Sequence, residues 1–313
     1  MKRIAFIFPG QGSQEAGMGK ALYEEYPEVK DLLDRADAEL GISLTGLMFE
    51  GPQEELTKTE NAQPALLVNS ASILEVLKKE DIRPVMTAGH SLGEYSALVA
   101  SGALEPLTAA RLVQKRGQLM EHAFPTGLGA MAAVLGLDKE QISTVLDDMD
   151  EKEVVDIANI NCPGQIVISG RKEGVEKASE LLKEAGAKRV LPLNVSGPFH
   201  SSLMRPASEE FAVALNEADL KDAEVPVYAN VTAEPVQDQD KIKELLVEQL
   251  YSPVRFQEIL EKFVEEDLDA IVEVGEGKVL SGLVRKVKRR MKTFNIQDPE
   301  SLQTFIEWYK EES

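Results

Sequence analysis

Residues 84–100 read PVMTAGHSLGEYSALVA and contain the pattern Gly-x-Ser-x-Gly, centred on Ser91. In this pattern the serine lies on a sharp turn between a strand and a helix, and the flanking glycines relieve crowding around its exposed hydroxyl. The neighbouring residues fit this context, because 84–88 read as a short buried strand and 94–100 as the start of a small-residue helix. We therefore predict that Ser91 is a nucleophile at a strand-to-helix turn.

The base for this serine can be sought among only three histidines, since histidine is the usual general base near neutral pH. His90 adjoins the serine but points in a different direction on a tight turn, so we expect it to have a packing role. His122 lies near the end of a predicted helix over 109–121, where surface or boundary packing is expected. His200 follows a rigid loop, and loops held by a scaffold often carry functional residues. His200 is therefore the predicted base.

No acidic side chain has a convincing context for orienting the ring of His200. The aspartates between Ser91 and His200 fall in a segment expected to lie away from the floor of the site, and include Asp138, Asp147, Asp148 and Asp156. A backbone carbonyl is the alternative, because it also fixes which ring nitrogen carries the proton.

Arg116 and the loop over 8–14 (FPGQGSQ) suggest what the site binds. A surface salt bridge is the plain interpretation of Arg116, but its planar guanidinium can also take a free carboxylate, which an ordinary ester does not offer. The loop lacks the Gly-Lys-Ser/Thr ending of a phosphate-binding loop and the spacing of a dinucleotide site. We expect a backbone N–H of this loop to face a developing oxyanion instead.

Strand and helix signals alternate over the first 120 or so residues, starting with a strand at 4–8 and including a helix at 64–79. Such alternation predicts a parallel sheet covered by helices. Residues 130–194 follow a different order, strand–helix–strand–strand–helix–strand, which predicts a ferredoxin-like unit. We therefore divide the chain into one domain over 1–125 and 198–313 and an inserted unit over 126–197, with Ser91 and His200 on either side of a cleft between them.

The composition of the chain limits its possible partners and its possible location in the cell. Acidic residues outnumber basic ones by 54 to 34, for a net charge of −20, which argues against a general nucleic-acid binder. No apolar stretch has the roughly 20 residues of a membrane span. The one cysteine, Cys162, excludes an intrachain disulfide and a cysteine-rich metal site, and fits a cytoplasmic location. Six basic residues crowd 285–292, as either a solvated helix face or a docking patch for an acidic partner.

Together these motifs resemble the malonyl-CoA:acyl carrier protein transacylases of bacterial fatty acid synthesis and, more broadly, the acyltransferase domains of polyketide synthases. The resemblance extends from FPGQGSQ at 8–14, through the Ser91 motif, to VGEGKVL at 274–280. It implies an α/β-hydrolase-like core with a parallel sheet and an inserted ferredoxin-like α+β subdomain. It also implies a cytoplasmic enzyme that has malonyl-CoA and acyl carrier protein as partners and needs no metal or redox cofactor.

The resemblance implies a role for each candidate residue. Ser91 would become malonylated, with His200 as its base, and Arg116 would hold the malonyl carboxylate. The backbone N–H groups of Gln11 and Leu92 would form the oxyanion hole. The main-chain carbonyl of Gln249 would orient His200, which matches the missing acid. An acidic carrier protein would be repelled by a chain of net charge −20, so its charge makes the basic stretch Arg285–Lys292 the expected docking patch.

Three other functions remain open at this stage. A polyketide-pathway acyltransferase would use the same residues. A serine esterase or thioesterase would use the same serine and histidine with water as acceptor, although the Arg116 interpretation argues against it. A non-catalytic carrier-binding protein could keep the fold, although the intact Ser91 and His200 argue against that.

Overall fold

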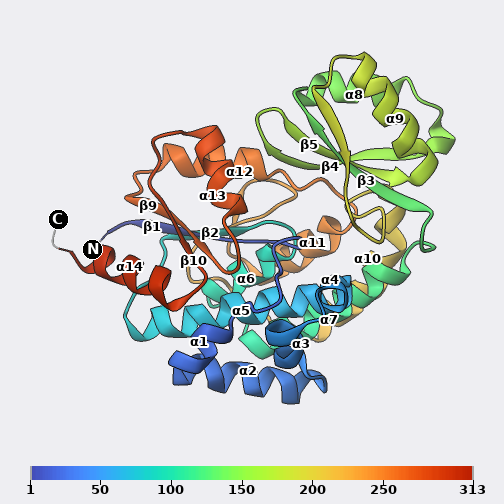
Figure 1. The fold of residues 1–313 in the computed structure, drawn as a ribbon. Helices are drawn as coiled ribbons and strands as arrows, with labels where there is room; N and C mark the ends of the chain where they lie inside the picture. The colour runs from blue at the N-terminus through green and yellow to red at the C-terminus, as the bar shows by residue number, and fades with distance from the viewer. Residues whose placement is uncertain (1, 312–313) are drawn as a thin grey trace.

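Two β-sheets with their helices make up the fold (Figure 1). The structure, a computed structural model, describes residues 2–311. The larger sheet has the strand order β10-β9-β1-β2-β7-β8. Every neighbouring pair in it is parallel except β7 with β8, which confirms the predicted parallel sheet. Its strands are β1 (Ile4–Phe8), β2 (Met86–Gly89), β7 (Val227–Tyr228), β8 (Pro235–Val236), β9 (Ala270–Val274) and β10 (Thr293–Ile296).

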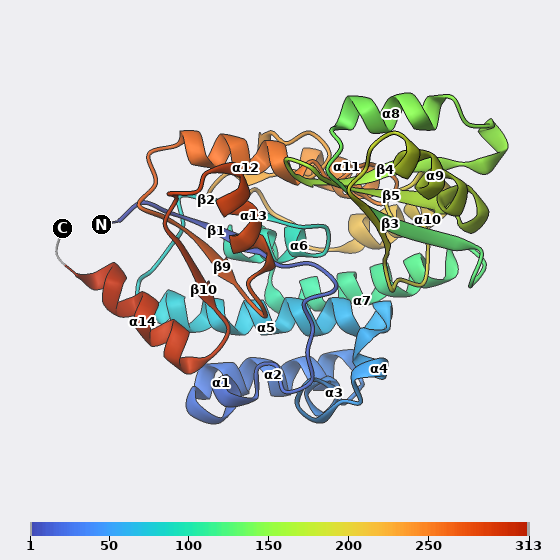
Figure 2. The same cartoon turned by 45° about the horizontal axis from the view of Figure 1, so that its top comes forward.

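Helices cover both faces of the larger sheet (Figure 2). Strand β1 is buried throughout, and its alternate residues enter two cores: Phe6 and Phe8 one, Ala5 and Ile7 the other. The second core is closed by α12 (Phe256–Glu265) and α13 (Val279–Val287). Helices with buried side chains in the first core are α1 (Lys20–Glu25), α2 (Pro27–Leu40), α3 (Leu44–Glu50), α4 (Gln53–Thr57), α5 (Thr59–Lys79), α6 (Gly93–Ala100), α7 (Pro106–His122), α10 (Arg205–Glu217), α11 (Gln239–Gln249) and α14 (Pro299–Lys310). None of the helices within residues 2–311 is long and apolar enough to cross a lipid bilayer.

The smaller sheet lies beside the larger one, at the upper right of Figure 1. Its strands are antiparallel in the order β4-β5-β3-β6, and α8 (Lys139–Asp147) and α9 (Lys172–Glu184) share a third core with it. The strand and helix order expected from the sequence is the order observed. The boundaries at 125 and 198 remain predictions. The strands are β3 (Gly129–Leu135), β4 (Val155–Cys162), β5 (Gln165–Arg171) and β6 (Arg189–Pro192), and two short 3-10 helices lie at Glu151–Glu153 and Ser202–Met204.

Backbone hydrogen bonds tie β4 of the smaller sheet to the larger part of the molecule. The N–H of Val254 donates to the carbonyl of Ala158 at 2.8 Å, and the N–H of Ile160 donates to the carbonyl of Val254 at 2.9 Å. Val254 directly precedes Arg255, the N-cap residue of α12. It therefore fixes the smaller sheet over the edge where β1, β2 and β7 end.

Among the predicted helices, α5 shows the largest boundary error. Helix α5 begins at Thr59, five residues before the predicted start at Pro64, and Pro64 lies inside the helix. Proline favours the first turn of a helix because it lacks an N–H, and this preference produced the error. Pro64 is the sixth residue of α5, and because it lacks an N–H, the helix loses one hydrogen bond there.

Candidate active site

Ser91 lies on the turn between β2 and α6 with a left-handed backbone, φ 52°. A residue with a side chain pays about 1–3 kcal/mol for this conformation. The flanking glycines are required by space, as predicted. A Cβ on Gly89 would lie 1.9 Å from the backbone of Gly93, and one on Gly93 would lie 2.2 Å from the carbonyl oxygen of Phe8. The turn therefore fits only the small residues that the sequence supplies.

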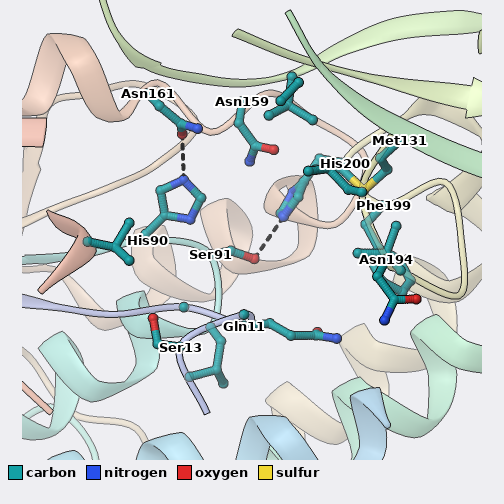
Figure 3. Close-up of a pocket in the computed structure, with 18 of the residues that line it drawn as sticks. Gln11, Ser13, His90, Ser91, Met131, Asn159, Asn161, Asn194, Phe199 and His200 are labelled. Carbon is teal, nitrogen blue, oxygen red and sulfur yellow. Dashed lines mark hydrogen bonds between the residues drawn. The ribbon is translucent and has the colours of Figure 1, made fainter. Parts of the chain in front are cut away.

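His200 lies next to Ser91, as Figure 3 shows, with its Nε2 2.7 Å from the Ser91 Oγ. Its Nδ1 lies 2.8 Å from the main-chain oxygen of Gln249. A carbonyl oxygen only accepts, so the ring proton is on Nδ1 and Nε2 is free to accept from the serine hydroxyl. His200 also has a left-handed backbone, φ 58°, so strain is concentrated at both members of the pair.

Arg116 comes from α7 and is buried, with 1% of its surface exposed. Its Nη2 donates to the Ser91 Oγ at 3.1 Å and to the Gln249 Oε1 at 2.8 Å, and its Nη1 donates to the Gln63 Oε1 at 2.8 Å. Among residues 2–311, no carboxylate forms a salt bridge with it, and its Nε has no partner. The surface salt bridge considered from the sequence is therefore excluded, and the guanidinium keeps donors for an anion.

The loop after β1 passes close to the serine turn. A Cβ on Gly10 would lie 2.4 Å from the carbonyl oxygen of His90, so the close approach requires glycine. Gln11 and Leu92 both line the pocket, and within the described residues the backbone N–H of neither donates a hydrogen bond. Two free N–H groups beside the serine are the donors that a tetrahedral oxyanion needs.

These residues share a pocket of about 330 Å³ between the two sheets. The larger sheet supplies the floor, and the smaller sheet supplies a wall that contains Met131, Asn159 and Asn161 (Figure 3). Within residues 2–311, histidine, cysteine, aspartate and glutamate form no group of three that could hold a metal ion.

A family model described as the acyl transferase domain matches residues 5–303 of the chain. The chain belongs to the acyl transferase family. It is 56% identical over 314 residues to the malonyl CoA-acyl carrier protein transacylase of Bacillus subtilis (strain 168), covering 100% of this chain and 99% of that one.

Solved structures of acyl transferases have the same fold. An acyl carrier protein S-malonyltransferase from Vibrio cholerae superposes with a TM-score of 0.94 at 44% identity, covering 97% of this chain and 99% of that one. A malonyl-transacylase in complex with a type II PKS acyl-carrier protein superposes with a TM-score of 0.95 at 42% identity, with the same coverage.

The other residues considered from the sequence of this acyl transferase make contacts that fit packing or capping roles. His90 lines the pocket, with its Nε2 2.7 Å from the Asn161 Oδ1 and its ring against Phe256. His122 is exposed at the end of α7, as expected. Asp138 caps α8. Asp156 accepts from the backbone N–H and hydroxyl of Ser202, both at 2.8 Å, so it holds the loop after His200 without touching the imidazole.

Sequence reasoning missed the buried polar residues beneath the serine of this acyl transferase. Glu94 and Asn230 are at most 3% exposed, and both bond the Gln249 side chain. Burial raises the pKa of the Glu94 carboxyl to about 7. The available signal for Glu94 was a carboxylate in a helix of small apolar residues. The signal for Asn230 was a polar residue two positions after the end of a buried strand.

The ring of His200 should stay neutral over the pH range in which an ordinary histidine titrates. Burial and, next, the positive charge of Arg116 lower the pKa of His200 to about 3. Between about pH 5 and pH 8, where an ordinary histidine changes charge, ¹⁵N NMR should therefore show an unchanged neutral ring with its proton on Nδ1. The His200→Asn variant assigns the signal. A charged ring within this range would show that burial and Arg116 do not lower the pKa of His200 as expected.

Proposed function

We propose that this chain transfers the malonyl group of malonyl-CoA to the phosphopantetheine thiol of acyl carrier protein, through a malonyl-serine intermediate, and so supplies fatty acid synthesis. One observation carries the proposal: the Ser91 Oγ lies 2.7 Å from the His200 Nε2 and 3.1 Å from the buried Arg116 Nη2. A nucleophile, its base and a partner for a free carboxylate thus meet in one pocket. The names of the similar proteins support the same reaction.

In the first half-reaction, the Ser91 Oγ attacks the thioester carbonyl while the His200 Nε2 takes the serine proton. The backbone N–H groups of Gln11 and Leu92 stabilise the oxyanion. The carbon–sulfur bond then breaks, and coenzyme A leaves as a thiol with the proton from His200. The Gln249 carbonyl keeps the ring in the tautomer that this exchange requires.

Arg116 binds the free carboxylate of the malonyl group. When Ser91 becomes an ester, its oxygen is a weaker acceptor, and the Arg116 donor that it held is available to the carboxylate. An anion on Arg116 also offsets the positive charge that helps to lower the pKa of His200. Binding of an anionic acyl group therefore strengthens the base.

In the second half-reaction, the carrier thiol attacks the malonyl-serine carbonyl while the His200 Nε2 takes the thiol proton. The ester C–O bond then breaks, and the Ser91 Oγ leaves with the proton from His200. A thioester is exchanged for a thioester, so the two ends of the reaction are close in free energy. The site must keep water away from the ester rather than drive the chemistry. The apolar side chains of Leu92, Met131 and Phe199 line the pocket and serve this purpose.

We further propose that residues 126–197 form the inserted domain, supported by a hydrophobic core of their own. We place the enzyme in the cytoplasm, because its cysteine, Cys162, is free and buried. The relative bound to a type II PKS carrier favours a second candidate, an acyltransferase of polyketide synthesis. Transfer rates to the two kinds of carrier protein distinguish these pathways.

The decisive experiment mixes the purified protein with malonyl-CoA alone and records its intact mass. We expect one malonyl adduct per chain and one equivalent of free coenzyme A. Added holo carrier protein should then discharge the adduct and gain the malonyl group. Release of coenzyme A without an adduct would instead identify a thioesterase. If neither an adduct nor free coenzyme A appeared, malonyl-CoA would be excluded as a substrate.

The basic stretch over 285–292 is the proposed docking site of the carrier protein. Its cations are all exposed, and none forms a salt bridge within residues 2–311; they are Arg285, Lys286, Lys288, Arg289, Arg290 and Lys292. The carrier is acidic by family expectation, so a chain of net charge −20 needs a local positive surface to receive it. The stretch lies on and after α13, which also lines the pocket.

Reversing three of these charges should weaken the carrier half-reaction alone. In the variant Lys286→Glu, Arg289→Glu, Arg290→Glu, we expect the KM for carrier protein to rise roughly ten-fold, because steering and docking lose their electrostatic attraction. Acylation by malonyl-CoA should be unchanged. A matched variant reverses three exposed lysines elsewhere, Lys78, Lys152 and Lys183. Equal effects of both variants, or an equal response of both half-reactions, would exclude docking at this stretch.

A further inference from the structure

Asn230 follows strand β7 and is fully buried beneath the serine turn. Its Nδ2 donates to the carbonyl oxygen of Gly89 at 2.7 Å, and its Oδ1 accepts from the N–H of Ser91 at 2.8 Å. One side-chain amide thus bonds the backbone on either side of His90 and holds the N–H of the strained Ser91. A side-chain amide can do this because it has a donor and an acceptor side by side.

Asn230 is itself held in place by contacts on its backbone. Its N–H donates to the Glu94 Oε2 at 3.1 Å, and its carbonyl accepts from the N–H of Arg255 at 3.0 Å. The Nε2 of Gln249 makes a further contact with its Oδ1 at 3.3 Å. Every polar group of Asn230 except one amide hydrogen therefore has a partner.

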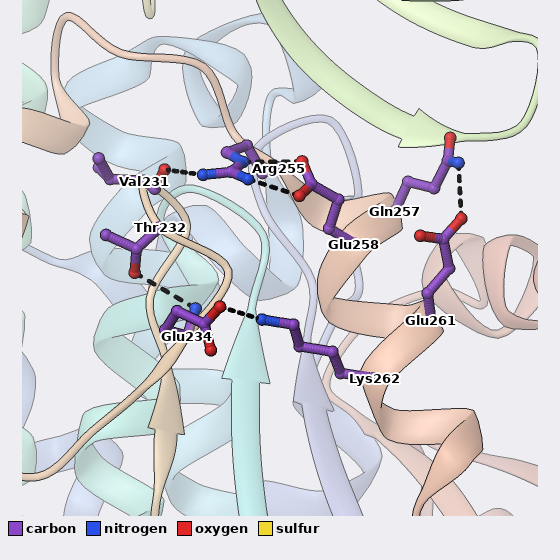
Figure 4. Close-up of polar contacts among 8 residues, drawn as sticks. All are labelled: Val231, Thr232, Glu234, Arg255, Gln257, Glu258, Glu261 and Lys262. Atoms are coloured by element: carbon purple, nitrogen blue, oxygen red, sulfur yellow. Dashed lines mark hydrogen bonds and ion pairs between the residues drawn. The ribbon is translucent and has the colours of Figure 1, made fainter.

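The loop that continues from Asn230 is tied to helix α12, as Figure 4 shows. Arg255 donates to the carbonyl of Val231 at 3.3 Å and is itself fixed by two bonds to Glu258, at 2.7 and 2.5 Å. Lys262 of α12 pairs with Glu234 at the other end of the loop. The loop is therefore anchored to a rigid helix, as precise positioning of Asn230 requires.

We propose that Asn230 is the positioning residue that holds Ser91 in its left-handed conformation. Strained residues persist only where their surroundings fix them. Asn230 fixes the backbone that leads into Ser91, and the Nε2 of Gln249 bonds the Ser91 carbonyl on the other side at 3.1 Å. It aims the Ser91 Oγ at His200. It also occupies the Ser91 N–H, which leaves the N–H of Leu92 as the donor from this turn to an oxyanion. The inference rests on the proposed function for the identity of Ser91 as the nucleophile.

The test measures the first-order rate at which Ser91 is acylated, by quenched mass spectrometry, in Asn230→Ala and Asn230→Asp. Asn230→Asp keeps the size and the acceptor but loses the donor to Gly89. We expect both variants to reach full labelling at a rate about 10²-fold lower, since a small misplacement of a reacting atom costs about that much. Malonyl-CoA and acetyl-CoA should slow by the same factor, because the carboxylate contact is untouched.

Asn69→Ala is the matched control, because Asn69 is equally buried and its side-chain amide has no partner among the described residues. It should acylate at close to the wild-type rate. A lower labelled fraction at an unchanged rate in the Asn230 variants would mean a folding role only and would overturn the proposal. An unchanged rate at full labelling would also overturn it. If Asn230→Ala does not fold, the rate of Asn230→Asp tests the proposal alone.

A fluorophosphonate that labels activated serines separates this inference from the proposed function. If wild-type protein reacts with the fluorophosphonate but not with malonyl-CoA, the proposed substrate is wrong. The comparison of Asn230 variants then continues with the fluorophosphonate. An equal fluorophosphonate rate in wild type and Asn230→Ala would overturn the positioning role.

Discussion

Replacing Ser91 with alanine should abolish the malonyl adduct and lower carrier-dependent transfer by at least roughly 10⁴-fold, because loss of a nucleophile that acts together with its base removes most of the catalysis. The remaining residues of the pocket still bind the thioester, so a KM for malonyl-CoA measured from residual activity should change little. Intact mass after incubation with malonyl-CoA gives the adduct, and carrier-protein malonylation gives the rate.

Ser96→Ala provides the control for this substitution. Ser96 lies on α6, five residues after Ser91, and its buried hydroxyl has no hydrogen-bond partner among the described residues. Its loss should leave the adduct and the rate close to those of wild type. A malonyl adduct that forms on Ser91→Ala would show that another residue is the acceptor, and peptide mapping would locate it.

Local patterns allowed much of the fold to be predicted. The alternation of short buried strands and helices indicates a parallel sheet, because such strands can be connected only by crossovers. The glycines around Ser91 predicted the turn, because the contacts that require them lie within one short segment. A Cβ on Gly89, for example, would clash with Gly93, four residues later. The start of α5 was predicted five residues too late, because Pro64 was taken to begin the helix, whereas it lies inside it.

The polar residues beneath the serine could not be predicted in this way. Asn230 is 139 residues from Ser91 in sequence and Gln249 is 158 residues away, so no local pattern links them. The position of Gln249 came only from a family resemblance, and its side chain, which bonds Arg116, had no predicted role. Arg116 itself was compatible with a surface salt bridge until packing showed it to be buried.

Replacing Arg116 should change which acyl group the enzyme prefers. Removing one partner of a buried charge pair costs about 3–4 kcal/mol, which corresponds to roughly a 10²- to 10³-fold loss of kcat/KM for malonyl-CoA in Arg116→Ala. Acetyl-CoA has no carboxylate for Arg116, so its transfer should change far less. The ratio of malonyl to acetyl transfer, measured with both thioesters on the same preparation, should therefore fall by about the same factor.

Arg116→Lys and Arg111→Ala separate carboxylate binding from packing. Lysine keeps the charge but has no planar fork, so it cannot bond Gln63, Gln249 and a carboxylate together, as we propose for Arg116. An intermediate malonyl preference is therefore expected. Arg111 lies on the same helix but is exposed and pairs with Glu39, so its loss should leave the preference unchanged. If malonyl and acetyl transfer fell equally in both Arg116 variants, Arg116 would be holding Gln63 and Gln249 in place rather than selecting a substrate. Selection by charge requires the two thioesters to diverge, because only malonyl-CoA carries a carboxylate that could pair with the guanidinium.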